Sequence, residues 1–260
     1  MKDLTVSIVT HNSENDILKL LESIYKFSSD LNFKIFVIDN ASKDNTVKLV
    51  KENYPEVYTV ESRKNMGFGK AHNLVLGKIS SDFHLIINPD IVINSNVIKN
   101  IISYLRKNPD VVIATPKILN PDGSLQSLPK KDPKLTYMLS GKLEKFSKYF
   151  SKVRQEYTMF KEENFSNIPF NIDFCTGCFM MIRTKVFKKL GGFDNIFFMY
   201  LEDADLSRRA KKYGKIMYLP CESATHLWHR DSSKKIKFFL IHLISMFKYL
   251  MKWKKDKQEC

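Results

Sequence analysis

Two segments far apart in the chain carry carboxylates at positions where proteins bind metal ions or transfer protons. The first is Asn88-Pro89-Asp90, which closes the short apolar run Phe83–Ile87. A run of this length that ends at a proline is typical of a buried strand. Ligands of open parallel sheets bind just beyond the carboxyl ends of the strands, so we expect Asp90 in such a crevice. Its hard oxygen atoms suit Mg²⁺ or Mn²⁺ and, through the metal, a diphosphate; a solvated turn is the alternative.

The second segment is Glu202-Asp203-Ala204-Asp205, which opens a helix expected over Leu201–Lys212. Acids are favoured at the positive end of any helix, so their presence alone does not establish a functional site. Asp205 has a further alternative role, because an acid at this position can pair with Arg208 or Arg209 along the helix.

The elements that would position these acids alternate between strand and helix. Strands are expected over Leu4–Thr10, Lys34–Ile38, Val57–Glu61, Phe83–Ile87, Val111–Ala114 and Phe174–Ile182. Helices are expected after Ser13, from Asp44 or Asn45 to Asn53, over Gly67–Gly77 and Val97–Lys107, and from Thr184. This alternation predicts an α/β fold with a mostly parallel central sheet flanked by helices. The first four strands end in polar residues that would face one crevice: Thr10 and His11, Asp39, Arg63 and Asp90.

The pattern divides the chain into a domain over residues 1–230 and a helical tail over residues 231–260. Within the domain, residues 120–171 are irregular and rich in Pro, Lys and Tyr, with weak helical character around Tyr137–Val153. Long irregular insertions in a compact domain are often functional, so we interpret this one as an acceptor-side segment.

The chain has 42 Lys and Arg against 28 Asp and Glu, a formal charge of +14, which indicates an anionic partner. Residues 232–257 predict a basic amphipathic helix, with Tyr249 and Trp253 placed for a lipid–water interface. An anionic membrane surface is therefore the expected partner, and a helix packed on the domain or at a homodimer interface is the alternative. Nucleic acid is disfavoured, because the charge accompanies a wide apolar face rather than a reading motif.

Other features narrow the class of protein. Met1-Lys2-Asp3 does not begin a signal peptide, and no apolar run is long enough to span a bilayer, so we expect a cytoplasmic protein. Cys175 and Cys178 have CxxC spacing but lie in an apolar run, which favours buried thiols over a metal or redox site. No GxGxxG follows the first strand, which argues against a dinucleotide-dependent dehydrogenase.

Several segments, in order, resemble one family. They are Val6–Asn12, Val37–Ser42, Asn65–Asn73, Leu85–Asp90, Gly177–Arg183, Gly191–Asp194, Glu202–Leu206 and His226. Together they resemble the family 2 inverting glycosyltransferases of the GT-A fold, particularly the bacterial rhamnosyltransferase-like branch. The resemblance covers roughly residues 4–230, and its specificity comes from the ordered set rather than from any one segment.

The resemblance implies a site for a nucleoside-diphosphate sugar. Asp39 would accept from the imide N–H of a pyrimidine base, with a turn-forming role as the alternative. Thr10, His11 and Asn12 would line the same pocket, and the backbone at Asn65 and Gly67 would approach the nucleotide. Asn88 occupies the position of the first acid in the family's DxD motif, a departure that leaves Asp90 as the firm carboxylate.

The resemblance also implies the metal site and the base. Asp90 and His226 would hold Mn²⁺ or Mg²⁺, with His229 as the competing histidine. Asp203 resembles the catalytic base that takes the proton of the acceptor hydroxyl, and Glu202 would contact the acceptor or the donor sugar. The implied function is transfer of a sugar, with rhamnose from dTDP-rhamnose favoured, to a lipid-linked or polysaccharide acceptor at the inner face of the cell membrane. The alternatives are a UDP-sugar donor and a catalytically silent, membrane-docked nucleotide-sugar-binding subunit.

Overall fold

A computed structural model describes residues 2–159, 161–162, 167–227 and 236–255, so His229 and the outer parts of the tail lie outside the described residues. The strands are β1 (Lys2–Thr10), β2 (Phe33–Asp39), β3 (Tyr58–Glu61), β4 (Ser81–Ile87), β5 (Ile91–Val92), β6 (Val111–Leu119), β7 (Phe170–Asn171), β8 (Phe179–Arg183) and β9 (Lys215–His226). The helices are α1 (Ile17–Ser28), α2 (Thr46–Asn53), α3 (Phe68–Asn73), the 3₁₀ turn η1 (Leu76–Lys78), α4 (Val97–Lys107), α5 (Leu135–Leu143), α6 (Lys148–Tyr157), α8 (Thr184–Lys189), α9 (Glu202–Ala210) and α10 (Ile236–Lys255).

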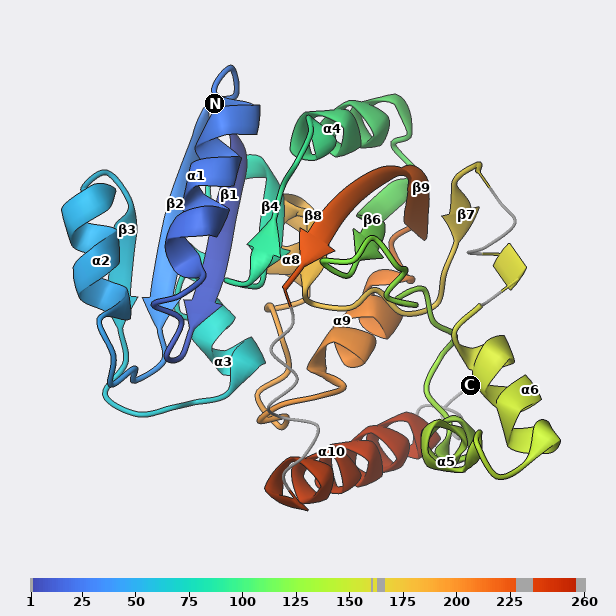
Figure 1. Ribbon diagram of the computed structural model, residues 1–260. Coiled ribbons are helices and arrows are strands. Elements are labelled where there is room, and N and C mark those ends of the chain that lie inside the picture. The colour runs from blue at the N-terminus through green and yellow to red at the C-terminus, as the bar shows by residue number, and fades with distance from the viewer. Residues whose placement is uncertain (1, 160, 163–166, 228–235, 256–260) are drawn as a thin grey trace.

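The described strands form one sheet in the order β3-β2-β1-β4-β8-β6-β9-β5, with β7 paired to β9 (Figure 1). Strands β1, β2, β3 and β4 pair in parallel, and so do β6 and β9, whereas β8, β5 and β7 pair antiparallel to their neighbours. The predicted α/β fold is confirmed, with antiparallel strands added to its mostly parallel sheet. Strand order reverses between β1 and β4, and such switch points create the ligand crevice of open sheets.

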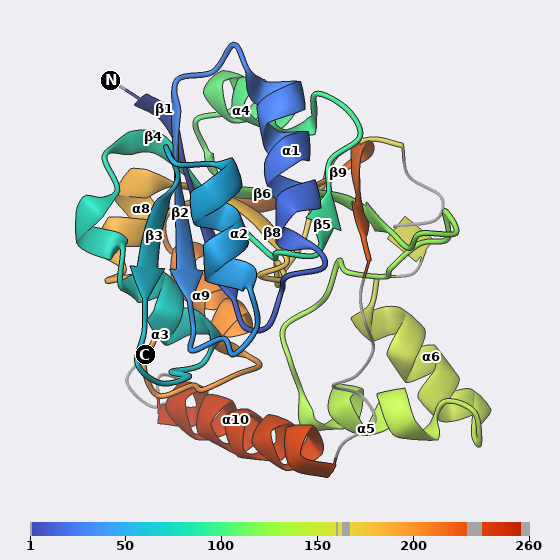
Figure 2. The same ribbon diagram turned by 60° about the vertical axis from the view of Figure 1, so that its left-hand side comes forward.

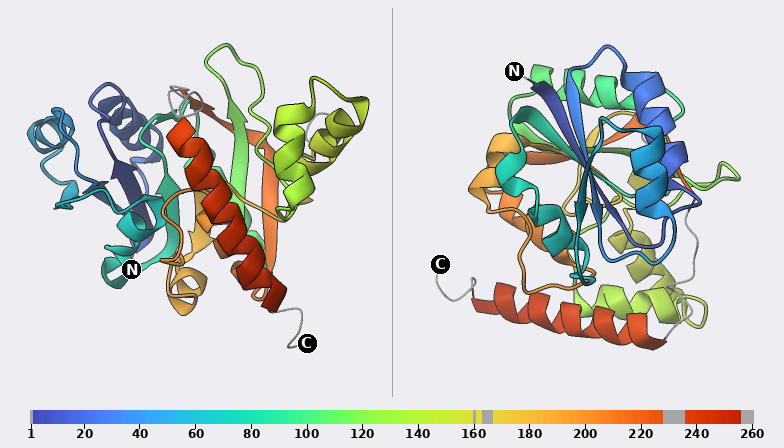
Figure 3. Two further views of the ribbon diagram at one scale, coloured as in Figure 1. Left: turned by 90° about the horizontal axis from the view of Figure 1, so that it is seen from below. Right: turned by 90° about the vertical axis from the view of Figure 1, so that its left-hand side faces the viewer.

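Helices cover both faces of the sheet, as Figures 2 and 3 show. On one face α1, α2 and α4 bury apolar side chains such as Leu20, Val50 and Ile101 against the sheet. On the other face α8 and α9 contribute Phe187 and Leu206 to a second cluster, and α3 contributes Ala71 to a third. Because both faces are covered, the ligand crevice is expected at the carboxyl edge rather than on a face.

Strand β9 is the largest element that the sequence pattern does not predict. It is 12 residues long and runs beside β6, but its register skips from Leu219 to Ser223. Pro220 lies in that interruption and has no N–H to donate to the ladder, so apolar alternation breaks in the middle of the strand. Strand β9 ends at His226 and thereby delivers that histidine to the carboxyl edge.

Two helices, α3 and α9, are shorter than expected, and the predicted strand at Phe174–Ile182 begins later, at Phe179. The helix expected over Gly67–Gly77 ends at Asn73 and is followed by the turn η1. Residues 120–171, expected to be irregular with weak helical character around Tyr137–Val153, contain α5 and α6, which pack against each other at the end of the molecule beside α10 (Figure 1).

The tail helix α10 runs along the side of the molecule toward which the arrowheads of β2, β3 and β4 point (Figure 1). Its inner face packs on the domain, where Met246, Tyr249 and Trp253 join one apolar cluster with Leu201 and Ala204. Tyr249 and Trp253 are 1% and 6% exposed, so their expected placement at a lipid–water interface is wrong. Within the part of the chain that the structure describes, no helix is long and apolar enough to cross a membrane.

The turn before α3 requires glycine. Gly67 has φ 86° and ψ 175°, a backbone region essentially restricted to glycine. A Cβ atom there would lie 1.9 Å from the carbonyl oxygen of Phe198, and the Phe68 N–H donates to that same oxygen at 3.0 Å. The close approach therefore joins the turn at Gly67 to the loop that leads into α9.

We expect Gly67→Ala to destabilise the protein by more than about 2 kcal/mol, because it adds both backbone strain and a clash with Phe198. Gly77→Ala is the matched control, since a Cβ at Gly77 meets no atom within 4 Å. The control should be neutral or stabilise by up to about 1 kcal/mol. Chemical denaturation of both variants measures the difference, and equal stability would contradict the structural requirement.

Candidate active site

Asp39 ends β2 next to Thr10, which ends β1 in register with it. The Thr10 hydroxyl donates to one Asp39 oxygen at 3.1 Å, and the Ser42 N–H donates to the other at 3.0 Å. Asp39 is 5% exposed, so these two bonds fix its carboxylate at the carboxyl edge. Each oxygen keeps a second lone pair that can accept from a ligand N–H.

His11 and Asn12 form the rim beside Asp39. The His11 Nδ1 atom lies 3.0 Å from the Asn40 carbonyl oxygen. The side-chain oxygen of Asn12 accepts from the Lys43 N–H at 2.8 Å. Asn12 has φ 57°, a left-handed conformation that asparagine tolerates. The structure thus brings Thr10, His11, Asn12 and Asp39 together at one position.

Asn65 and Gly67 join this group through Asn40. The Asn40 side chain donates to Asn65 Oδ1 at 3.1 Å and to the Gly67 carbonyl at 3.2 Å, and it accepts from the Met66 N–H at 2.8 Å. These bonds account for the turn in structural terms. The nucleotide contact of Asn65 and Gly67 stays a prediction.

Asp90 and His226 meet where β5 pairs with the end of β9. Ile91 is in register with His226, and the Leu227 N–H donates to the Asp90 carbonyl at 2.8 Å. As a result His226 Nε2 lies 3.1 Å from Asp90 Oδ1. Two residues that are far apart in the sequence therefore share one end of the sheet.

Gln126, which the sequence pattern does not single out, orients His226. Its amide nitrogen donates to Asn120 Oδ1 at 2.9 Å and to the His226 carbonyl at 3.1 Å. Its amide oxygen is then the acceptor for His226 Nδ1 at 2.9 Å, which places the ring proton on Nδ1. Nε2 is the ring nitrogen that faces Asp90, and an acceptor that holds the other ring nitrogen is typical of metal-binding histidines.

The Asp90–His226 pair fits a divalent ion. Two adjacent ligands of an octahedral ion at usual bond lengths lie roughly 3 Å apart, which matches the separation of these two atoms. Among the described residues, no cluster of three or more His, Cys, Asp and Glu side chains is found that would enclose a metal ion. Mg²⁺ commonly takes one or two protein ligands and completes its shell with water and substrate phosphates.

Asp203 lies in the first turn of α9 and is held by backbone donors. Its Oδ2 atom accepts from the Gly177 N–H at 3.0 Å, and its Oδ1 atom accepts from the Ala204 N–H at 2.9 Å. Burial raises the pKa of Asp203, while the Gly177 N–H and the charge of Lys130 lower it. The carboxylate is half-buried, so a lone pair remains available to a substrate.

Glu202 is the neighbouring carboxyl and has a different environment. It is 4% exposed, and burial together with the charge of Asp203 raises its pKa well above the usual value. Its Oε2 atom is buried and has no hydrogen-bond partner among the described residues. Glu202 therefore favours the neutral form, whereas the neighbouring Asp203 ionises more readily. Such a difference between the pKa values of two adjacent carboxyl groups is typical of sites with distinct acid and base roles.

The segment Gly177–Cys178 lies between Asp203 of α9 and the segment Asn88–Asp90 that follows β4. The Gly177 N–H donates to Asp203, and the Cys178 carbonyl accepts from the Asn88 N–H at 3.0 Å. Burial raises the pKa of the Cys178 thiol to about 11, and the charges of Asp90 and Asp203 both add to that increase. Cys175 and Cys178 are both buried free thiols, as predicted.

Contacts also connect this segment to the turn at Gly67. A Cβ atom at Gly177 would lie 2.7 Å from the Phe68 ring and 3.8 Å from the Asp203 side chain. Phe68 follows Gly67, whose carbonyl is bonded to Asn40, the residue after Asp39. The three predicted acids Asp39, Asp90 and Asp203 are therefore joined by short chains of contacts along one edge.

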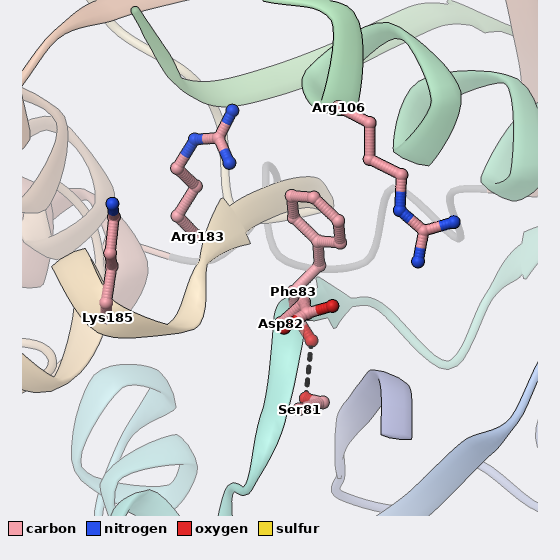
Figure 4. A pocket seen from close by; sticks show the side chains of 6 residues that line it. All are labelled: Ser81, Asp82, Phe83, Arg106, Arg183 and Lys185. Carbon is pink, nitrogen blue, oxygen red and sulfur yellow. Dashed lines mark hydrogen bonds between the residues drawn. The ribbon is translucent and has the colours of Figure 1, made fainter. Parts of the chain in front are cut away.

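A cavity of about 360 Å³ lies at the opposite edge, lined by Ser81, Asp82, Phe83, Arg106, Arg183 and Lys185 (Figure 4). Arg106 is paired with Asp3. Arg183 donates to the Val111 and Asn108 carbonyls, at 2.7 Å and 3.1 Å. These two guanidinium groups are occupied by structural contacts. This cavity is therefore a weaker candidate for a ligand site than the carboxyl edge.

Sequence comparisons match the chain to known families and proteins. The family described as "Glycosyl transferase family 2" matches residues 5–191, and the one described as "N-terminal domain of galactosyltransferase" matches residues 157–230. The rhamnosyltransferase WbbL of Escherichia coli K12 is 29% identical over 94% of this chain and 91% of its own length. An N-acetylglucosaminyl-diphospho-decaprenol L-rhamnosyltransferase of Mycobacterium tuberculosis is 24% identical over 86% and 75%, respectively.

Solved structures show the same fold. The mannosyltransferase PcManGT from Pyrobaculum calidifontis, in complex with GDP-Man and Mn²⁺, superposes with a TM-score of 0.63 at 18% identity, covering 97% of this chain. S. aureus TarS 1–349 in complex with UDP-GlcNAc superposes with a TM-score of 0.61 at 20% identity, covering 95%. This chain spans 66% of the length of each of those two chains and 60% of TarS 1–349 in another crystal structure.

The match to the family covers well over half of the chain, and the solved neighbours have the same fold. The chain therefore belongs to glycosyl transferase family 2, and it is a glycosyltransferase of the GT-A fold with rhamnosyltransferases among its relatives.

Proposed function

We propose that this protein is a divalent-metal-dependent inverting glycosyltransferase that moves rhamnose from dTDP-rhamnose to a lipid-linked or polysaccharide acceptor. The observation that carries the proposal is the shared position of three acids, with Asp39, Asp90 and Asp203 connected along the carboxyl edge of the sheet. The two rhamnosyltransferases among the relatives support rhamnose as the sugar.

Asp39 is the proposed contact for the base of the donor. A carboxylate accepts well from the imide N–H that thymine and uracil share, so this contact selects a pyrimidine without distinguishing the two. Thr10, His11, Asn12, Asn65, Gly67 and Asn88 are the further donor contacts that we propose. A UDP-sugar is the competing donor, supported by the TarS structure with UDP-GlcNAc.

Asp90 and His226 are the proposed holders of Mn²⁺ or Mg²⁺. The chemistry supplied by a divalent ion bound there is stabilisation of the negative charge on the departing nucleoside diphosphate. PcManGT was crystallised with Mn²⁺, which supports a divalent ion without deciding between the two.

Asp203 is the proposed base. Inversion requires one displacement at the anomeric carbon, and the attacking alcohol is a poor nucleophile until its proton is removed. The Gly177 and Ala204 N–H groups hold the carboxylate in place, and a lone pair stays free for the acceptor hydroxyl. Glu202, held neutral by burial, is the proposed contact to a sugar hydroxyl of the acceptor or donor.

An anionic membrane surface at the inner face of the cell membrane is the proposed location of the reaction. The outer face of α10 carries a stripe of exposed apolar side chains, namely Ile236, Leu240, Ile244, Phe247 and Met251. Lys237 and Lys254 are also exposed on this helix, and the combination of apolar and basic groups suits an interfacial helix. Phe146, just before α6, and Tyr149, within α6, are 84% and 63% exposed.

The donor and the metal are tested together by thermal stabilisation. We expect dTDP-rhamnose with Mn²⁺ to raise the melting temperature more than UDP-GlcNAc or GDP-Man does, because the three donors differ in base and sugar. Removal of Mn²⁺ with EDTA should abolish most of the shift. An equal shift with every donor, with or without metal, would contradict the proposed donor site.

Gln126→Ala should weaken Mn²⁺ binding about 10- to 100-fold in the presence of the nucleoside diphosphate, because it removes the partner that orients His226. Gln155→Ala, at an exposed position on α6, is the control. Calorimetric titration with Mn²⁺ measures the affinity without relying on turnover. Identical affinities in the two variants would remove His226 from the metal site.

Asp203→Asn should lower kcat by about 10²- to 10⁴-fold while donor binding stays nearly intact. Because the folded pKa of Asp203 is raised, the base loses its charge at a higher pH than an ordinary aspartate, and kcat should fall as pH decreases through that raised value. Lys130→Met should shift this decrease to still higher pH, since the Lys130 charge lowers the pKa.

Lys131→Met is the matched control for the pH profile, because Lys131 pairs with Glu156. Turnover measured from pH 5 to pH 9 in both lysine variants separates the effects. An Asp203→Asn enzyme with unchanged turnover would remove the base assignment, and superimposable pH profiles would remove the influence of Lys130.

Membrane docking is tested on the exposed stripe of α10. The double substitution Ile244→Ser with Phe247→Ser should reduce binding to phosphatidylglycerol vesicles by about tenfold or more, because both side chains lose apolar contact with lipid. Leu74→Ser with Ile168→Ser changes two exposed apolar residues elsewhere and should bind like the unmodified protein. Vesicle flotation gives the readout, with phosphatidylcholine vesicles as the neutral comparison.

Equal flotation of the two double variants would refute docking through α10. A monomer–dimer equilibrium that only the Ile244→Ser and Phe247→Ser protein loses would instead identify a second copy as the occupant of this face.

A further inference from the structure

The loop before α9 has a strained backbone. Tyr200 and Leu201 have φ values of 69° and 64°, so two consecutive residues other than glycine occupy the left-handed region. This conformation is unfavourable for such residues and persists only where surrounding contacts hold it. The next residues in the chain are Glu202 and Asp203, so this loop sets the direction in which the proposed base enters the site.

The inner face of α10 supplies contacts that hold this loop. The Ser245 hydroxyl donates to the Met199 carbonyl at 2.7 Å, and the Lys248 ammonium donates to the Ile196 carbonyl at 2.8 Å. Leu201 is 4% exposed, and it belongs to the same buried cluster as Met246, Tyr249 and Trp253. Both the backbone and the side chains of the loop are therefore fixed against the tail helix.

Asp205 makes the second connection between α9 and α10. It has no exposed surface and accepts from the Arg209 Nε atom at 2.7 Å, the Trp253 Nε1 atom at 3.2 Å and the Lys252 ammonium at 2.6 Å. Two of these three donors come from α10. Because a buried carboxylate is costly when its partners are removed, Asp205 ties the first turns of α9 to the tail helix.

Further contacts extend the same junction on either side. Lys252 also pairs with Asp194 at 2.7 Å, at the start of the loop. The Tyr249 hydroxyl donates to Asp132, which also accepts from Arg208 of α9 at 2.9 Å. The Arg208 guanidinium in turn lies over the Trp253 ring, 4.2 Å from its centre.

We propose that the inner face of α10 is a positioning strap for the active site: through Ser245, Lys252 and Trp253 it holds the 199–201 loop and the start of α9, so that Asp203 faces Gly177 and Cys178. The inference rests on the proposed role of Asp203 as the base. It assigns α10 two faces with different tasks, the inner one acting on catalysis and the outer one meeting the proposed membrane.

The strap has a specific kinetic consequence. Asp39 and Asp90 are held by bonds within the sheet and its loops, and the strap acts on α9 and the loop before it. Loosening the strap should therefore displace the base and leave the Asp39 and Asp90 groups of the donor site in place. Small displacements of a catalytic group lower the rate strongly, whereas donor affinity depends on the groups that stay in position.

The test compares Lys252→Met with Lys212→Met, which removes the same charge from an exposed position just after α9. The assay is release of nucleoside diphosphate from dTDP-rhamnose, or from the donor that gives the greatest thermal shift, with water in place of the acceptor. Lys252→Met should lower kcat about 10- to 100-fold and leave the donor KM within about twofold. Lys212→Met should retain the kcat and KM of the unmodified enzyme.

Two conservative variants separate positioning from a general loss of stability. Lys252→Arg keeps a cation for Asp205 and should restore most of kcat. Trp253→Phe keeps the ring contacts but removes the donor to Asp205, so it should lower kcat less than Lys252→Met does. All assays are run at least about 15 °C below the lowest melting temperature of the set, so that every variant is folded under the assay conditions.

Several results would overturn the strap. They are equal kcat in the Lys252→Met and Lys212→Met enzymes, a donor KM that rises in step with the loss of kcat, and a loss of kcat that follows the unfolded fraction. Asp203→Asn in the same assay distinguishes the two proposals. If it abolishes turnover and Lys252→Met leaves kcat unchanged, only the strap fails; if it retains turnover, the base assignment fails and the strap fails with it.

Discussion

The backbone of Gly177 and Cys178 is the constraint on which the site depends. One peptide group donates to Asp203, and the next residue accepts from Asn88, so the helix that carries one acid and the strand end that carries the other are set at a fixed separation. Gly177 has no room for a side chain, because the Phe68 ring fills the space where a Cβ would lie. The same two residues therefore fix the spacing of the acids and join them to the turn beside the Asp39 pocket.

The three carboxyl groups at the start of α9 lie in different environments and therefore differ in their properties. Glu202 and Asp203 are adjacent, yet burial without a partner raises the pKa of Glu202 well above normal, while backbone donors and Lys130 oppose the same effect on Asp203. Asp205, two residues further along, is fully buried and fully paired. One short helix thus carries a buried carboxyl without a partner, a carboxyl held by backbone donors and a buried carboxyl paired with cations, and the difference lies in what each side chain touches.

The sequence predicts the part of the site that depends on local pattern. Strands β1, β2 and β4 have short apolar runs that end in Thr10, Asp39 and the segment before Asp90, and the parallel order of these strands follows from their alternation with helices. The pairing of Asp205 with Arg209, one of two alternatives, follows from helical spacing and is confirmed.

What the sequence does not predict depends on contacts between distant residues. The sequence does not predict strand β9, because its middle segment, around Pro220, does not pair with β6. Gln126 is a single amide in an irregular region, and only the fold shows that it holds His226. Tyr249 and Trp253 were expected at a lipid surface, but aromatic side chains suit a membrane interface and a buried interface equally well, and only the packing of α10 decides between them.

The dependence of Asp205 on α10 has a consequence for how the chain folds. During synthesis the sheet and α9 leave the ribosome before residues 236–255, so Asp205 is complete only when the tail helix arrives. Until then the loop at Tyr200 and Leu201 lacks the contacts that hold its strained backbone. The contacts that complete the start of α9 accordingly form later than those within the sheet.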